Sequence, residues 1–423
     1  PCPGGYFTPE MQLTAQVAHR RPGTGFFAIY AFAYAGTLLA LLTPIYVTLA
    51  LRVREISPAA VDANLSLVLA VGALSALVGN PVFGRLSDRT TSRLGMRRPW
   101  LLLGAAGGAG SLWLISCAPS IGLVLLGWCL AQVSFNAVLA ALMAVLPDQV
   151  PVSQRGTVAG LLGVCTPVGT TVGTFLVDSV SDSMTAMFMV PAAVGVSAIV
   201  ALAIVLPDRR LERKPPPARL AETARSFWIN PREHPDFAWM WSGRLLMMMG
   251  MAFLISYQPL YLMDHLGYEA AQVPDLVFRS TLAQSIAFVS ASLLCGRLSD
   301  VLGRRKVFVI GAALIYAVAA AMIALATSFS VFLVAIVIAG FGLGGFLAVD
   351  LALVTEVLPN READAAKDLG LFNVASTLPQ TIAPGAGAAI LALTHQNHTV
   401  LFLAAAFAAA CAALAIFPVR GAR

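Results

Sequence analysis

Twelve apolar runs, separated by short polar segments, make up most of this chain. Each run is close to the length of about 20 residues that crosses a bilayer as a helix. The pattern therefore predicts an all-α membrane protein with twelve transmembrane helices. The runs lie at 26–50, 62–83, 99–117, 121–146, 156–178, 185–206, 238–263, 275–295, 307–327, 331–357, 368–393 and 399–418.

The longest polar segment divides the runs into two sets of six. It is basic and contains the run Pro215-Pro216-Pro217, so it cannot continue as a membrane helix. We therefore predict two six-helix bundles joined by a cytoplasmic linker, with a cytoplasmic tail at each end. The predicted parts are a tail at 1–24, a bundle at 25–206, the linker at 207–237, a bundle at 238–418 and a tail at 419–423.

A short motif occurs twice at corresponding places in the two sets. Gly84-Arg85-Leu86-Ser87-Asp88 returns as Gly296-Arg297-Leu298-Ser299-Asp300, 212 residues later (296 minus 84). The same offset relates Pro147 to Pro359 and Pro167 to Pro379. Parallel repeats that rock around a central site are a known plan for transporters. The repeat therefore predicts two pseudo-symmetric halves.

Composition and charge agree with a multi-pass membrane protein. Only 11% of the residues are charged, against about 25% in soluble domains. Of the 27 Lys and Arg residues, all but Arg52, Arg54, Arg244 and Arg279 lie in tails or loops on one side of the predicted membrane. The positive-inside rule places that side, with both termini, in the cytoplasm. Membrane topology accounts for the net charge of +6, so we expect no nucleic-acid partner.

The residues that usually hold metals or perform catalysis are scattered. The six cysteines show no paired spacing. All five histidines lie in predicted tails or loops, at His19, His234, His265, His395 and His398. We therefore predict a protein that is not an enzyme, without metal or cofactor. We expect a monomer in the inner (cytoplasmic) membrane, whose partners are the bilayer and a small-molecule substrate.

The duplicated loop resembles the signature of the major facilitator superfamily. Its two copies lie between runs 2 and 3 and between runs 8 and 9, and the second continues through Gly303-Arg304-Arg305-Lys306. This resemblance implies a twelve-helix transporter that works by alternating access. It also implies a cytoplasmic gate made of Asp88, Arg89, Asp300 and Arg304. Glu356, near the cytoplasmic end of run 10, is a further gate candidate.

The first copy is longer than the usual signature and resembles the loop of two symporter groups. These are the sucrose–proton symporters and the glycoside–pentoside–hexuronide:cation symporters, and the similarity extends from Asp88 to Trp100. Leu41-Leu42-Thr43-Pro44 is also similar to the sucrose-symporter pattern. Runs 1 and 3 to 6 hold no interior carboxylate, which argues against coupling to sodium.

We therefore expect a secondary active transporter for proton-coupled symport of a sugar, glycoside or similar polar solute. The alternative is a proton-coupled exporter of an amphipathic drug or metabolite. The methionine-rich segment Met247-Met248-Met249 favours this alternative, as does the lack of charged residues in the interiors of the first six runs.

Asp350 is the candidate for proton coupling. It lies nine residues before Pro359, about 13 Å inside the predicted cytoplasmic end. Ionisable groups at such depth are rare and mark functional sites. A structural ion pair with a cytoplasmic arginine is the alternative. Asp275 and Arg279, one helical turn apart, are expected at the outer mouth, either as a local ion pair or as an outer gate.

Polar side chains on several runs suit a hydroxylated, neutral substrate, since amides and phenols can both donate and accept hydrogen bonds. Hydrogen bonding between helices is the competing explanation for them. The predicted cavity residues are Tyr30, Tyr34, Thr37, Gln132, Asn136, Tyr257, Gln258, Tyr261, Asn373 and Gln380.

Overall fold

The protein is described by a computed structural model that covers residues 24–208, 232–356 and 365–419. In these residues the chain is helical, and its only β-type pairing is an isolated bridge between Ser92 and Gly95. The prediction of an all-α protein is confirmed. The linker prediction and the predicted tail at 1–24 lie largely outside the described residues, so the predicted domain bounds stay a prediction.

The first bundle contains six long helical segments. Its first segment is continuous through α2 (Thr24–Thr43), the π-helix η1 (Pro44–Thr48) and α3 (Leu49–Ile56), and a 3-10 turn η2 (Pro58–Ala60) follows. The other helices are α4 (Val61–Asp88), α5 (Arg98–Cys117), α6 (Ile121–Gln149), α7 (Val152–Ser179) and α8 (Met184–Val205).

The second bundle repeats this plan. It begins with α10 (Pro235–Leu260) and a π-helical segment η3 (Tyr261–His265). The remaining helices are α11 (Val273–Leu302), α12 (Arg305–Ala324), α13 (Phe329–Glu356), α14 (Ala365–Leu393) and α15 (His398–Ile416). In each bundle the π-helical segment begins at or shortly after a proline, Pro44 or Pro259, which cannot donate a backbone hydrogen bond to the preceding turn.

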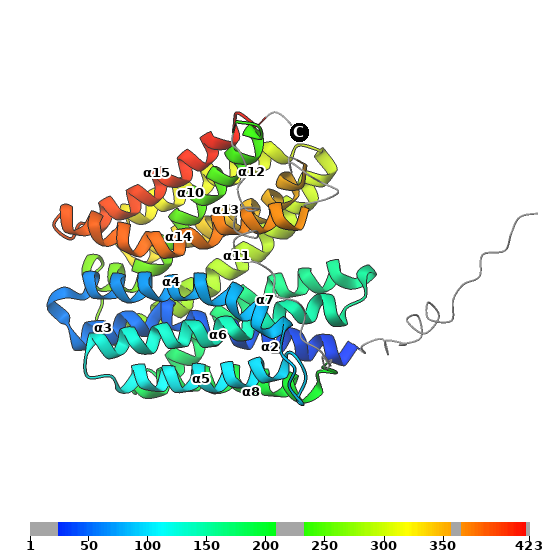
Figure 1. The fold of residues 1–423 in the computed structure, drawn as a ribbon. Helices are drawn as coiled ribbons and strands as arrows, with labels where there is room; N and C mark the ends of the chain where they lie inside the picture. The colour runs from blue at the N-terminus through cyan, green and yellow to red at the C-terminus, as the bar shows by residue number, and fades with distance from the viewer. Residues whose placement is uncertain (1–23, 209–231, 357–364, 420–423) are drawn as a thin grey trace, which may run out of the picture.

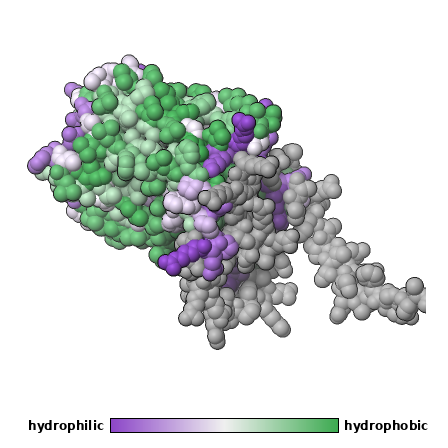
Figure 2. Space-filling model, turned by 90° about the horizontal axis from the view of Figure 1, so that it is seen from above, coloured by the Kyte–Doolittle hydropathy of each residue, from purple (hydrophilic) through white to green (hydrophobic). Residues whose placement is uncertain are grey.

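Eleven segments of the described part are long and apolar enough to cross a membrane. The helix α14 is not among them, although it has 29 residues. Its apolar content is diluted by Thr377, Gln380, Thr381 and two internal prolines. Figure 2 shows the corresponding surface, a broad apolar face with hydrophilic residues toward its ends.

Figure 1 shows the two bundles side by side, each with its helices roughly along one direction. We call the end where α4 finishes at Asp88 and α12 begins at Arg305 the linker end, because the linker leaves the first bundle there. The end where α3 finishes at Ile56 and α15 begins at His398 is the opposite end. The most extensive contacts between the bundles are those of α4 with α14 and of α7 with α11, and η1 also contacts α10 and α11.

Close packing within the first bundle depends on small residues. Gly72 of α4 lies against the indole of Trp128 on α6, and a Cβ added at Gly72 would overlap that ring. Trp128 is completely buried, so the ring cannot swing into lipid without leaving a void. Gly84, on the same helix, has no atom within 4 Å of the position of an added Cβ.

We expect Gly72→Ala to destabilise the first bundle by about 1–3 kcal/mol, because the added methyl overpacks a filled core. Gly84→Ala is the matched control, and it should be neutral or slightly stabilising because alanine favours the helix. Thermal unfolding of both variants in the same detergent tests this. Equal midpoints for the two variants would show that the α4–α6 contact yields easily.

Candidate functional site

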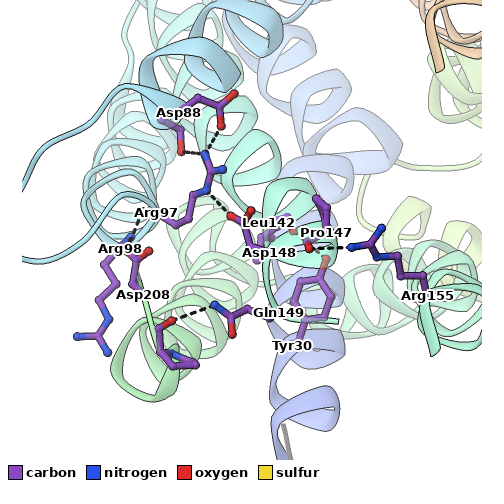
Figure 3. Close-up of polar contacts among 12 residues, drawn as sticks. Tyr30, Asp88, Arg97, Arg98, Leu142, Pro147, Asp148, Gln149, Arg155 and Asp208 are labelled. Carbon is purple, nitrogen blue, oxygen red and sulfur yellow. Dashed lines mark hydrogen bonds and ion pairs between the residues drawn. The ribbon is translucent and has the colours of Figure 1, made fainter. Parts of the chain in front are cut away.

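Arg97 connects three segments at the linker end of the first bundle (Figure 3). Its Nη1 donates to Asp88 Oδ1 at 2.6 Å and to Ser87 Oγ at 2.8 Å, both at the end of α4. Its Nε donates to Asp148 Oδ2 at 3.0 Å, near the end of α6. The Arg97 side chain is only 6% exposed, whereas Asp88 is 61% exposed. One buried guanidinium therefore fixes the ends of α4 and α6 to the start of α5.

Asp208 joins the same region to the beginning of the linker. Its Oδ2 accepts hydrogen bonds from the backbone N–H groups of Arg97 and Arg98, at 2.7 and 2.8 Å. These N–H groups lie at the N-terminus of α5, where a carboxylate is favoured. Gly95 approaches Asp208 so closely, with φ of 108°, that no side chain would fit there. Gln149 also donates to the Pro207 carbonyl at 2.9 Å.

The second bundle contains the same arrangement at its linker end. Arg305 Nη2 contacts Asp300 Oδ1 at 2.9 Å, which corresponds to the pair of Arg97 and Asp88. Lys306 donates to the carbonyls of Phe417 and Val419, both at 2.7 Å, as Arg98 donates to the Leu206 carbonyl. The duplicated sequence is thus a duplicated set of contacts.

The two motif carboxylates have arginine partners that are not among the predicted gate residues. Asp88 and Asp300 pair with Arg97 and Arg305, each inside its own bundle, rather than with Arg89 and Arg304. Neither Arg89 nor Arg304 has a side-chain partner among the described residues. In the sequence, Arg97 follows Gly95 by two residues, and Arg305 follows Gly303 by two residues. An alignment of these two glycines would therefore have identified Arg97 and Arg305 as equivalent residues. The Glu356 side chain lies outside what the structure describes.

Arg244 and Asp350 form an ion pair inside the second bundle. Asp350 of α13 is completely buried, and its Oδ2 accepts from Arg244 Nη1 of α10 at 2.5 Å. Arg244 also donates to Ser376 Oγ of α14 at 2.5 Å, and its guanidinium lies 4.7 Å from the ring centre of Phe372. The other carboxylate oxygen, Asp350 Oδ1, is buried and has no hydrogen-bond partner among the residues that the structure describes.

Most of the predicted cavity residues are buried and bonded to the protein. Tyr30 donates to the Leu142 carbonyl at 2.8 Å, and Thr37 to the Ala33 carbonyl at 2.7 Å. Tyr261 donates to the Ile323 carbonyl at 2.5 Å, and Gln258 to Ser280 at 2.7 Å. Tyr34 is partly exposed and Gln380 is exposed, while the Asn373 side chain lies outside the described residues.

An amide chain runs across α4 and α6, and it includes one residue that sequence reasoning missed. Asn80 donates to Asn136 Oδ1 at 3.3 Å, and Asn136 donates to the carbonyl and to the side chain of Gln132. Gln132 and Asn136 are buried, whereas Asn80 is exposed. Asn80 therefore presents the solvent-accessible end of this chain.

Side-chain contacts join the two bundles only toward the opposite end, within the described residues. Arg54 pairs with Asp264 at 2.6 Å. Deeper in the protein, the Tyr257 hydroxyl lies 2.6 Å from both Ser66 Oγ and the Pro384 carbonyl, which connects α4, α10 and α14. A third contact links Thr171 of α7 to Ser285 of α11 at 2.9 Å. Asp275 and Arg279 pair locally on α11 at 2.7 Å and do not bridge the bundles.

Comparison with known proteins assigns the fold. The model of the Major Facilitator Superfamily matches residues 24–283 and 278–423. A mutant of the nucleoside transporter NupG covers 93% of this chain and 98% of its own, with a TM-score of 0.74 and 12% identity. A bacterial homologue of the human lysosomal transporter Spinster, inward-facing and occupied, covers 93% and 96%, with a TM-score of 0.70 and 14% identity.

One curated protein is similar in sequence over part of the chain. A stretch of 127 residues is 29% identical to the general alpha-glucoside permease of Schizosaccharomyces pombe (strain 972 / ATCC 24843). It covers 26% of this chain and only 23% of that permease. The matching family and the structural neighbours are transporters rather than enzymes.

We expect Arg97→Gln to lower the stability of the first bundle by about 1–2 kcal/mol, since both carboxylate partners are partly exposed and regain water. Arg93→Gln, an exposed arginine of the same loop, is the matched control. Thermal unfolding in detergent provides the comparison. A midpoint for Arg97→Gln equal to that of the control would show that the network does not hold the helix ends.

We expect Tyr257→Phe to loosen the bundles at the opposite end, because it removes the hydroxyl that connects Ser66 to Pro384. The expected result is an increased spacing between spin labels placed at Ser57 and Glu269, measured by pulsed electron resonance. Tyr268→Phe, which removes a phenol in the same region, should leave the spacing unchanged. An identical distance distribution in all three proteins would contradict the assigned role.

Proposed function

Because the chain belongs to the major facilitator superfamily, we propose that it moves a small polar solute, such as a sugar or glycoside, in symport with protons. The pair of Arg244 and Asp350 is the observation that carries the proposal. A buried carboxylate can bind a proton and so become neutral, whereas a permanent charge would be expensive at that depth. An arginine stays charged, so it supplies a fixed partner for a group whose charge changes.

The surroundings of Asp350 suit such a role. Its Oδ2 is held by Arg244, while its Oδ1 is buried without a partner. In the proposed cycle, a proton binds Asp350 and weakens the ion pair with Arg244. The guanidinium then keeps its contacts with Ser376 and Phe372, which hold it in the bundle. Binding of the proton and of the solute are coupled because both favour the same arrangement of these helices.

Contacts at the two ends support alternating access as the transport cycle. The bundles are joined toward the opposite end by Arg54 with Asp264 and by Tyr257 with Ser66 and Pro384. At the linker end, Asp88 and Asp300 pair within their own bundles. With the linker end assigned to the cytoplasm from the distribution of Lys and Arg, this arrangement corresponds to an inward-facing state.

Two observations favour a hydroxylated solute over an amphipathic one. Asn80 and Gln380 are exposed amides, and the partial match to an alpha-glucoside permease concerns a protein named for glucosides. The methionines of α10 were an argument for the export of an amphipathic compound. Met247 and Met248, however, are buried inside the second bundle. Localisation to the inner membrane with cytoplasmic termini, and function as a monomer, belong to the same proposal.

We expect Asp350→Asn to abolish uphill uptake driven by an imposed pH gradient, because the amide cannot exchange a proton. Exchange of labelled for unlabelled solute should persist. Proteoliposomes loaded from a panel of sugars and glycosides provide both measurements. Asp182→Asn, an exposed carboxylate outside the helices, is the matched control.

Unchanged uphill uptake by Asp350→Asn would remove Asp350 from proton coupling. Solute movement opposite to the proton gradient in the unaltered protein would instead favour the exporter. Arg244→Gln should impair both uphill uptake and exchange, because it leaves the Asp350 carboxylate buried and unpaired.

A further inference from the structure

A small pocket lies at the linker end of the first bundle, in the loop that follows the repeated motif. It has a volume of about 360 Å³ and is lined by Leu86, Arg89, Thr90, Thr91 and Trp100. These residues come from the end of α4, the following loop and the first turn of α5. The pocket thus combines one cation, two hydroxyl groups and an aromatic ring at the end of a membrane helix.

The pocket is held open by contacts within its own wall. Trp100 Nε1 donates to Thr90 Oγ1 at 2.8 Å, and the indole packs edge-on against Phe83 at 5.3 Å. Thr90 in turn donates to the Leu86 carbonyl at 2.7 Å. Arg89 has no side-chain partner among the described residues, so its guanidinium is available to an anion. The neighbouring carboxylate of Asp88 is already neutralised by Arg97.

An exposed apolar stripe leads away from the pocket along α4. Val78, Val82 and Leu86 are 64%, 44% and 44% exposed, and they follow one another at intervals of four residues, with Arg89 three residues further on. Residues at this spacing lie on one face of a helix. A cation at the helix end, continued by an apolar face toward the membrane centre, matches a phosphate followed by acyl chains.

The repeat supplies an internal comparison. A second pocket, of about 380 Å³, lies at the corresponding place in the second bundle and is lined by Leu298 and Phe308, the counterparts of Leu86 and Trp100. Its other lining residues are apolar or glycine. The counterpart of Arg89 is Val301 (89 plus 212), which is 84% exposed. Of these two pockets, the first contains a basic residue and a tryptophan, and the second contains neither.

We propose that the first pocket binds the phosphate of an anionic membrane phospholipid, with its acyl chains along Val82 and Val78. Arg89 donates to the phosphate, the exposed Thr91 hydroxyl supplies a further donor, and Trp100 sits at the level of the headgroup. Basic pockets at helix ends are a recognised way to hold acidic lipids. The proposal does not depend on the transported solute.

The test is native mass spectrometry of the delipidated full-length protein, titrated with dioleoyl phosphatidylglycerol. Arg89→Gln should weaken binding of the first lipid about tenfold, since hydrogen bonds to charged groups contribute on that scale. Arg93→Gln, which removes an equal charge from the same loop outside the pocket, should bind as the unaltered protein does. Val301→Arg should gain a second bound phosphatidylglycerol.

Separate arms distinguish a lipid from other anions. Glycerol 3-phosphate, which carries the phosphate without chains, should not displace the lipid at equal concentration. Displacement by glycerol 3-phosphate would overturn the lipid assignment in favour of a soluble phosphate ligand. Lipid binding that is unchanged in both Arg89→Gln and Val301→Arg would overturn the site itself.

Discussion

Polar groups among membrane helices must find partners within the protein, because hydrocarbon offers none. This constraint explains most of the polar side chains that interrupt the apolar runs. The hydroxyl groups of Thr37 and Thr43 donate to the carbonyls four residues earlier in the same helix. The Tyr30 hydroxyl donates to a carbonyl of α6. Each of these hydroxyl groups thus has a carbonyl partner, either in its own helix or in a neighbouring one. Eight buried side-chain atoms of the described residues lack a hydrogen-bond partner, and one of them, Asp350 Oδ1, belongs to the ion pair proposed to couple transport to protons.

The same constraint shapes the helix ends at the linker side, where charge is used to organise loops. In each bundle an arginine meets the motif carboxylate, and the next basic residue meets carbonyls at the end of the sixth helix. These contacts tie together the ends of α4, α5, α6 and α8 in the first bundle, and those of α11, α12 and α15 in the second. Two such bundles can move as bodies, provided that few side chains cross between them. The crossing contacts of the described residues are those of Arg54 with Asp264, of Tyr257 with Ser66, and of α7 with α11 through Thr171 and Ser285.

The sequence was sufficient for the fold because its signal is repeated many times. Each apolar run independently predicts a membrane helix, and the runs match the observed helices within a few residues. Individual partners were harder to predict, since they depend on the rotation of each helix. Arg244, for example, was not identified from the sequence as the partner of Asp350, yet it is nearly buried against that carboxylate. A tyrosine hydroxyl can bind a ligand or donate to a carbonyl of a neighbouring helix. The sequence around Tyr30, Tyr257 and Tyr261 does not distinguish these two roles, and in the structure all three hydroxyl groups donate to carbonyls.

Duplication makes the differences between the halves informative. At the offset of 212, the counterpart of Asp350 is Val138, which is also completely buried. The two positions thus share burial but differ in chemistry, so the carboxylate is an addition to a shared scaffold and not a requirement of it. The charge of Asp350 must be stabilised by its neighbours, because burial alone would disfavour it. Arg244 of α10 pairs with Asp350 and is itself held by Ser376 of α14. A change in the charge of Asp350 therefore acts first on α10 and α14. Both helices contact the first bundle, α10 through the hydrogen bond between Tyr257 and Ser66, and α14 by packing against α4.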